Sequence, residues 1–281
     1  MADTYVQKIK RWARMHLLFT LAKKHIYNSY YRKTLSASDF PPEIWIENTN
    51  YCNAKCVMCP REEQTRPLGY MEFLLFQKLI REIAEHRESV KRVHMHNYGE
   101  PLLDKELPNR IRLAKNLGIQ HVYFVTNASL LTEEKSREII ESGLDQFKIS
   151  FYGTDKETYN TTMKGLDFDR TIQNVKDFLR IRKELHKSAP RVIIQYLPQK
   201  TNKAQVDTFQ KTFAPLIDVA LGDTLNVFSL HNFGSGISPT QNNAVCSICD
   251  YPWRTMVILH DGRVVLCCLD FNGVQVVGNV K

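Results

Sequence analysis

Three cysteines, Cys52, Cys56 and Cys59, lie within one short segment. The segment follows an apolar run at residues 44–46 with the pattern of a β-strand, so the thiols would lie at the carboxyl end of a strand, where barrel enzymes build their active sites. Three thiolates on one loop can bind three irons of a four-iron cubane and leave the fourth iron without a protein ligand. Ferredoxins and zinc sites usually close their metal with four ligands. The spacing therefore predicts an iron–sulfur site that is open to a further ligand.

A second group of four cysteines, Cys246, Cys249, Cys267 and Cys268, lies near the end of the sequence. Clustered cysteines in a reducing compartment indicate metal sites rather than a disulfide framework. Successive residues of a strand point to opposite faces, so Cys267 and Cys268 are not expected to bind one centre together. We therefore predict a second centre on Cys246, Cys249 and Cys267, with Cys268 as a fourth ligand or a spare thiol.

The elements that must position these groups alternate along the chain. Strand patterns cover residues 44–46, 93–96, 122–125, 147–151, 192–194 and 225–228, and helix patterns lie near 73–83, 107–117, 132–143, 172–179 and 206–213. Such alternation predicts an α/β fold with a parallel sheet and right-handed crossovers. Six units are too few for an eightfold barrel, so the prediction is a partial (β/α)6 TIM-type barrel. An Asp-Gly turn at 261–262, between apolar runs at 257–259 and 264–266, adds a small C-terminal β-hairpin module that could bind a cluster.

These patterns divide the chain into three predicted parts. Residues 1–40 form a basic amphipathic helix, residues 41–235 the barrel, and residues 236–281 the cysteine-bearing module, after a linker rich in Gly, Ser and Asn. The basic helix could make weak contact with a membrane surface, or it could pack on the barrel with its lysines in solvent. We favour packing on the barrel.

The C-x3-C-x2-C spacing resembles the motif of the radical S-adenosylmethionine (radical SAM) superfamily, and the resemblance extends over roughly residues 43–281. It implies an enzyme that holds a 4Fe-4S cluster on Cys52, Cys56 and Cys59. Such an enzyme cleaves SAM reductively to methionine and a 5′-deoxyadenosyl radical, which abstracts a hydrogen atom from the substrate. The resemblance also implies an electron-donating partner such as flavodoxin or ferredoxin.

The resemblance also implies which residues bind SAM. The run Gly99-Glu100-Pro101 after the second strand corresponds to the motif that contacts the SAM amino group, and polar residues at later strand ends would meet the ribose and carboxylate. The backbone of the residue between the last two cysteines would meet the adenine. The implied set is Met58, Gly99, Glu100, Pro101, Thr126, Asn127, Ser150 and Gln195, with Asn202 as a weaker match.

The C-terminal segment resembles the opening of a SPASM or twitch module, which binds auxiliary clusters. The residues that match are Cys249, Trp253, Asp261-Gly262-Arg263, Cys267-Cys268 and Gly278-Asn279-Val280. A full module continues with further cysteines, so this one is either short or a truncated form. We predict an auxiliary 4Fe-4S cluster here. Cys268 is the candidate hydrogen donor, and Asp270 is a candidate acid or base that could instead cap a turn.

Two alternatives compete with this interpretation. The first is zinc, bound by the first cysteines with His94 or His96, or by the second group alone. The two histidines share one strand face and could also line a substrate cavity or be packed in the barrel. The second alternative is a non-catalytic iron–sulfur electron carrier or sensor. The open three-cysteine site beside the Gly-Glu-Pro run argues against it.

The charge and the apolar content of the sequence limit the classes of partner that we expect. The net charge is +8, but the first 40 residues hold eight basic and two acidic side chains, so the remainder is nearly neutral and nucleic-acid binding is not expected. No apolar run is long enough to cross a membrane and no signal peptide is evident, which predicts a cytoplasmic protein. No peptide-docking segment precedes the barrel, so we expect a small natural-product or carbohydrate substrate and its oxidation or epimerisation. A peptide or protein substrate is the alternative.

Overall fold

A computed structural model describes residues 39–199, 202–228, 249 and 251–281. The predicted N-terminal helix, the linker and Cys246 lie outside the described residues. Within the described part, no helix is long and apolar enough to cross a membrane.

A nine-stranded sheet forms the centre of the molecule, in the order β11-β10-β9-β1-β3-β4-β5-β7-β8. The six strands of the predicted barrel are all present and parallel to their neighbours. They are β1 (Glu43–Ile46), β3 (Arg92–His94), β4 (Val122–Thr126), β5 (Gln146–Ser150), β7 (Arg191–Tyr196) and β8 (Thr224–Val227). The prediction of a partial barrel is therefore confirmed.

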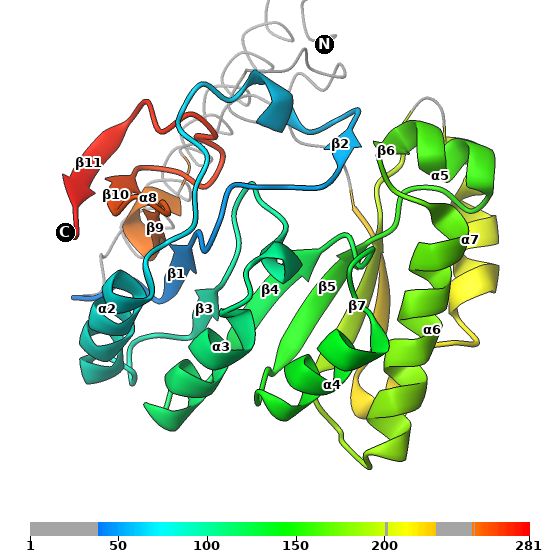
Figure 1. Cartoon of the computed structure of the whole chain (residues 1–281), viewed down its shortest axis with the longest axis horizontal. Coiled ribbons are helices and arrows are strands. Elements are labelled where there is room, and N and C mark those ends of the chain that lie inside the picture. Colours follow the sequence, from blue (N-terminus) through cyan, green and yellow to red (C-terminus); the bar gives the residue numbers. More distant parts are fainter. Residues whose placement is uncertain (1–38, 200–201, 229–248, 250) are drawn as a thin grey trace, which may run out of the picture.

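Helices cover one face of this sheet, as Figure 1 shows for those that follow β1, β3, β4 and β5. The main helices are α2 (Phe73–Glu85), α3 (Leu107–Asn116), α4 (Glu133–Glu141), α6 (Phe168–Glu184) and α7 (Val206–Phe213). Thr132 caps α4 as expected, because its side chain accepts a hydrogen bond from the Lys135 amide at 3.3 Å. Each helix presents an apolar stripe to the sheet, which is how the pattern of period 3.6 produces a layered fold.

The outer, helix-covered face of the sheet is the main core. Alternate strand residues such as Val93, Phe124, Phe147 and Ile194 are fully buried there. The Phe147 ring packs edge-on against Phe178 of α6, with 4.8 Å between the ring centroids. The residues between them point to the inner face, which makes the inner face the place to look for chemistry.

The C-terminal strands extend this same sheet. Strand β9 (Thr255–Ile258) pairs in parallel with β1, and β10 (Arg263–Val265) and β11 (Val276–Asn279) follow it as antiparallel strands. The predicted hairpin is present, and Figure 1 shows it beside β1. Its attachment to the first barrel strand was not predicted, because a pairing between residues more than 200 positions apart leaves no local pattern. The boundary at residue 236 stays a prediction.

Several short elements also escaped prediction. They are β2 (Lys55–Cys56), β6 (Met163–Lys164), α5 (Lys156–Thr162), α8 (Tyr251–Arg254) and the 3-10 turns η1 (Pro60–Glu63), η2 (Pro101–Leu103), η3 (Lys203–Gln205) and η4 (Val219–Leu221). Elements of two to seven residues are too short for a clear periodic signal. The β2–β6 pair has a function in the fold, because it ties the first cysteine loop to the loop after α5.

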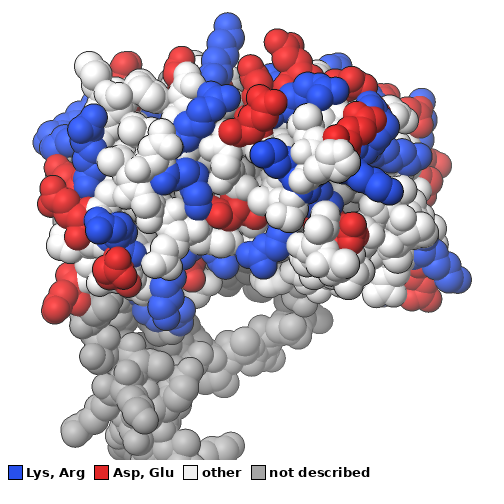
Figure 2. Space-filling view, turned by 90° about the horizontal axis from the view of Figure 1, so that it is seen from below, with Lys and Arg blue, Asp and Glu red and all other residues white. Residues whose placement is uncertain are grey.

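The side of the molecule that lies at the bottom of Figure 1 carries both basic and acidic side chains. In Figure 2, basic and acidic side chains alternate across the described residues of this face. A nucleic-acid site would need a basic patch or stripe, and this face presents none among the residues that are described.

Candidate functional site

The three thiols of the first group line one cavity of about 270 Å³ at the carboxyl ends of the strands. The loop that carries them is held at its middle. Cys56 pairs with Met163 in the β2–β6 ribbon, and the Val57 amide donates to the Thr162 carbonyl at 3.0 Å. The structure thus brings Cys52, Cys56 and Cys59 together at the place where the sequence predicted an active site.

The electrostatics of these thiols suit a cationic centre. Burial, and then the nearby Glu100 carboxylate, raises the pKa of Cys52 to about 12. Burial and the neighbouring thiols raise the pKa of Cys56, and burial raises that of Cys59. A bound metal centre reverses this effect because its positive charge stabilises thiolates. The donor set therefore fits the iron–sulfur cluster that the spacing predicts.

The zinc alternative would need His94 or His96 as a ligand beside the three thiols. His94 instead bonds Glu43 at 2.9 Å and stacks on Trp45, with 3.7 Å between the ring centroids. His96 lines the cavity. The sequence had allowed either this position or one packed inside the barrel.

Glu100 lies at the back of the same cavity, and both of its carboxylate oxygens accept hydrogen bonds. One oxygen accepts from the Thr126 hydroxyl at 2.6 Å and from the Leu102 amide at 3.1 Å, and the other accepts from the Asn127 amide at 2.8 Å. Burial outweighs these bonds and raises the pKa of Glu100. The carboxylate thus joins the end of β4 to the turn η2, and a ligand amine would be a favourable neighbour for it.

Gly99 allows the turn before Glu100 to exist. A β-carbon at this position would lie 2.1 Å from the Thr49 carbonyl oxygen and 2.8 Å from that of Tyr51. No side chain fits in that space. The Glu100 amide then donates to the Tyr51 carbonyl at 2.7 Å, and Pro101 starts η2. The Gly-Glu-Pro run therefore locks the cysteine loop against the second barrel strand.

Most of the other residues implied for SAM line the cavity as well. Met58, Thr126, Asn127 and Ser150 are among its walls. Gln195 is not a wall residue, but it is buried and pairs with Ser150 in the β5–β7 register. Asn202 lies apart from the cavity.

The amide group of Asn202 donates to the carbonyls of Tyr152 and Leu197, at 3.1 and 3.2 Å. These bonds close a loop. Asn202 was the weaker match among the residues predicted to bind SAM, and in the structure its side chain holds a loop instead.

A hydrogen-bonded chain that the sequence did not reveal connects the cysteine loop to the end of β4. The Asn127 amide donates to Asn53 at 3.0 Å, Asn53 donates to the Ser129 hydroxyl at 2.8 Å, and that hydroxyl donates to Asn127 at 2.7 Å. Ala128 between them has a φ of 59°, in the left-handed region that costs energy for a residue with a side chain. Asn53 adjoins Cys52, so its position beside the motif was the available signal.

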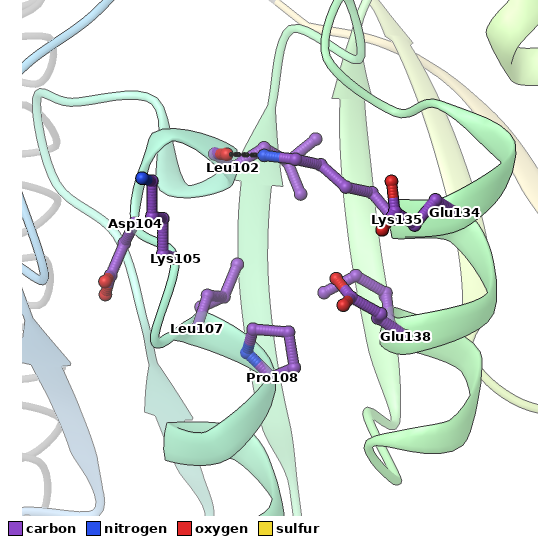
Figure 3. Close-up of a pocket in the computed structure, with 9 residues that line it drawn as sticks. Leu102, Asp104, Lys105, Leu107, Pro108, Glu134, Lys135 and Glu138 are labelled. Carbon is purple, nitrogen blue, oxygen red and sulfur yellow. Dashed lines mark hydrogen bonds between the residues drawn. The ribbon is translucent and has the colours of Figure 1, made fainter.

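Lys135 supports the site from behind. Figure 3 shows it extending from α4 across a cavity of about 190 Å³ to the carbonyl of Leu102, the residue after Pro101. Its charge also lowers the pKa of Glu100 against the effect of burial. The cavity itself lies on the helix side of the sheet, between α3 and α4.

The second cysteine group lies beside the first. Cys267 and Cys268 follow β10 in a turn, not on a strand, so the expectation that their side chains diverge is wrong. Their free thiols form a hydrogen bond with each other. This hydrogen bond lowers the pKa of Cys267 to about 6 and raises the pKa of Cys268. Cys249 is exposed and close enough to Cys268 to affect its pKa. The geometry therefore brings Cys267 and Cys268 together, with Cys249 nearby.

Asp270 closes the turn after these cysteines. Its two carboxylate oxygens accept from the amides of Val274 and Gln275, at 3.0 and 2.8 Å. This is the turn-capping use that the sequence allowed. A catalytic role for Asp270 stays a prediction.

Tyr98 lies between the two cysteine groups. Burial first, and then the charges of Cys268, Cys59 and Cys267, raises its pKa. Its ring also meets Phe271 edge-on, with 6.0 Å between the ring centroids. One aromatic residue thus contacts the surroundings of both predicted centres.

Buried ion pairs fasten the two cysteine segments to each other. Arg66, downstream of the first group, bonds both oxygens of Glu47 at 2.5 Å, and Glu47 also accepts from the His260 amide at 3.2 Å. The Arg66 side chain further donates to the Phe271 carbonyl at 2.8 Å. The two groups therefore sit on one connected framework.

Solved structures share this fold. The structure of Streptococcus suis SuiB bound to precursor peptide SuiA matches with a TM-score of 0.64 and 16% identity, over 93% of this chain and 67% of that one. The structure of BtrN in complex with AdoMet and 2-DOIA matches with a TM-score of 0.56 and 20% identity, over 86% of this chain and 79% of that one.

Curated relatives align over part of their length. The tungsten-containing aldehyde ferredoxin oxidoreductase cofactor-modifying protein of Pyrococcus furiosus is 25% identical over 163 residues, which are 58% of this chain and 45% of that protein. The chain spans less than half the length of the curated relatives it matches first.

Two family matches agree with the two cysteine groups. Residues 249–281 match the iron–sulfur cluster-binding SPASM domain, whose members carry auxiliary clusters. Residues 46–189, which include the three-cysteine loop and the Gly-Glu-Pro turn, match the Radical SAM superfamily. Proteins of this family bind a 4Fe-4S cluster and SAM. The chain therefore belongs to the radical SAM superfamily and carries a SPASM segment.

Proposed function

We propose that this protein cleaves SAM reductively in the cavity of the first cysteine group and abstracts a hydrogen atom from a small substrate bound beside it. The observation that carries the proposal is the shared cavity: three thiols and the Glu100, Thr126 and Asn127 cluster form its walls. When bound, the cluster and SAM supply the electron transfer and the hydrogen abstraction.

The residues of the chain bind and orient in this proposal. Cys52, Cys56 and Cys59 would hold the cluster, and Glu100 would accept hydrogen bonds from the SAM ammonium group. Thr126 and Asn127 keep the Glu100 carboxylate in place by their own hydrogen bonds. Preorganised acceptors of this kind need no rearrangement when the ligand binds.

Cleavage of SAM is tested with the anaerobically reconstituted protein. We expect 5′-deoxyadenosine, detected by mass spectrometry, after addition of dithionite and SAM. The matched control replaces Cys52, Cys56 and Cys59 by alanine and should give none. Equal amounts from both proteins, or none above a protein-free control from the unmodified chain, would favour an iron–sulfur carrier or sensor.

The auxiliary centre is proposed to use Cys249 and Cys267 with Cys246, and Cys268 either completes it or stays free. Iron and sulfide are measured in a Cys246→Ala/Cys249→Ala variant. We expect a loss of about one cluster per chain, with the first cluster retained. An unchanged iron content would remove this proposal and leave the SAM-cleaving site untouched.

The net reaction is proposed to be either oxidation or epimerisation of the substrate, and solvent deuterium separates them. If Cys268 returns a hydrogen atom to the substrate radical, its exchangeable thiol hydrogen places one deuterium in the product in D2O. An oxidation places none. A peptide substrate in place of a small molecule would appear as a mass change of the peptide under the same conditions.

A further inference from the structure

Lys148 lies on the inner wall of the barrel, in the middle of β5. Its neighbours Phe147 and Ile149 are fully buried on the outer face, so Lys148 points to the opposite, inner side. Ser150, two residues further along the same face, is a wall of the cavity that holds the three thiols. Lys148 therefore sits one layer below that cavity.

The register of the strands places Lys148 beside the cavity residues. It pairs with Val125 of β4, which is also a cavity wall, and with Ile193 of β7. Burial lowers the pKa of His96, another wall residue, and the charges of His94 and Lys148 lower it further. Lys148 therefore lies near the His96 side of the cavity.

No anionic group compensates Lys148 among the residues that the structure describes. Burial lowers the pKa of Lys148, and the charge of Arg92, which repels the ammonium group, lowers it further. Glu43, an acid on β1, bonds His94 at 2.9 Å. The electrostatic balance around Lys148 is therefore positive.

Further cationic and basic groups continue along the same wall. The Arg92 guanidinium donates to His121 at 3.2 Å and lies over the Tyr123 ring. Arg191, which pairs in register with Gln146, approaches the other nitrogen of His121 at 3.5 Å. The inner face below the cavity thus carries Lys148, Arg92 and Arg191. The two acids that act on this group, Glu43 and Asp145, bond His94 and Lys115.

A partly buried cation without a partner costs free energy, because it loses hydration and gains no counter-charge. Barrel interiors are ordinarily filled with branched apolar side chains, which would be more stable here. A cation that is kept beside a ligand cavity is therefore best explained by a ligand that neutralises it. A carboxylate or a phosphate would do so through charge-assisted hydrogen bonds.

We propose that Lys148 binds an anionic substituent, a carboxylate or a phosphate, of the substrate from the floor of the cavity. This inference rests on the proposed function, in which the substrate lies beside SAM in that cavity. The reacting carbon would face the cysteine loop above, and the anion would face β5 below. Substrates with an acidic group are then selected over neutral sugars and amines.

The test measures binding of two simple anions by titration calorimetry. Inorganic phosphate and succinate are titrated into the cluster-loaded full chain in the presence of saturating SAM, so that the site for the SAM carboxylate is already filled. Glucose is the neutral probe. The variants are Lys148→Met, Lys148→Arg, and Lys91→Met as a matched control, because Lys91 is exposed and lies before β3.

We expect at least a tenfold loss of anion affinity in Lys148→Met, less than a threefold change in Lys148→Arg and none in Lys91→Met. Tighter binding of phosphate than succinate would point to a phosphate ester, and the reverse order to a carboxylic acid. Equal anion affinity in Lys148→Met and the unmodified chain overturns the inference. So does a heat of binding for glucose that responds to Lys148→Met as strongly as the anions do.

Failure of this inference and failure of the proposed function give different results. SAM binding and 5′-deoxyadenosine are measured on the same samples. If no 5′-deoxyadenosine forms but the anions still depend on Lys148, the SAM chemistry is wrong and the anion site stands. If 5′-deoxyadenosine forms and the anions ignore Lys148, only the anion site falls.

Discussion

The inner and outer faces of the central sheet are built from the same strands, yet they carry opposite chemistry. On the outer face Val93, Phe124 and Phe147 are fully buried beneath helices. On the inner face the neighbouring positions are His94, Tyr123 and Lys148. A barrel interior filled with apolar layers would stabilise the fold more. The outer face therefore supplies the stability of the sheet, and the inner face gives up part of it for binding.

The adjacent pair Phe147 and Lys148 offers the sharpest test of this contrast. Phe147→Ala removes a fully buried ring that packs on Phe178, so we expect the free energy of unfolding to fall by about 3–5 kcal/mol. Lys148→Met, one residue away, should leave it within about 1 kcal/mol of the original because an unpaired cation is removed. Urea unfolding of the apo-protein measures both. A larger loss for Lys148→Met than for Phe147→Ala would break the comparison.

The inner face should also respond to acid, which the apolar outer face does not. Burial lowers the pKa of His94 from 6.5 to about 4, so the unfolded chain takes up its proton first. The stability due to neutral His94 is complete above pH 6.5 and is lost as the pH falls from 6.5 to about 4. The loss amounts to roughly 3 kcal/mol.

This acid loss is measured as the free energy of unfolding against pH. His94→Asn should flatten the curve between pH 6.5 and 4, whereas His86→Asn, at an exposed position on the outer side, should leave its slope unchanged. The Glu43 carboxyl, whose pKa the bond from His94 lowers, adds a further loss at the acid end. An identical slope in His94→Asn would show that the His94 imidazole is not the source.

The smallest effect is expected for Lys135, which lies on the helix-covered side of the sheet and supports the Glu100 site from behind. Lys135→Met removes a donor to the Leu102 carbonyl and a positive charge that favours ionised Glu100. We expect SAM affinity to fall about fivefold, from the loss of roughly 1 kcal/mol. Lys105→Met, in the same outer cavity but exposed, is the control and should change little. The SAM affinities are measured by equilibrium dialysis with labelled SAM. Equal affinities of Lys135→Met and the unmodified chain would show that Lys135 does not support SAM binding.

Much of this contrast could be predicted from the sequence, because both faces leave a local pattern. The six barrel strands, their helices and the cavity position of the first cysteines follow from alternation and from spacing. The pattern at 147–151 already separates Phe147 and Ile149 from Lys148. Local periodicity is sufficient to predict a strand or a helix wherever the burial of one face alone decides the conformation.

The parts that were missed depend on contacts between distant residues. The parallel pairing of β9 with β1 and the bond between Asn53 and Asn127 join segments far apart in the chain. The placement of Cys267 and Cys268 in a turn was missed for another reason: an apolar run continued the strand pattern up to them. Neither kind of feature leaves a periodic signal in the sequence.

The pairing of β9 with β1 makes the two family segments a single folding unit. A shortened chain ending before residue 249 would leave β1 paired with β3 on one side only. Its other edge would be open next to an apolar core, and such an edge invites association with other chains. It would also deprive the buried Glu47 of its bond to His260. Swapping SPASM segments between relatives should therefore succeed only when the first strand and its Arg66 anchor travel with them.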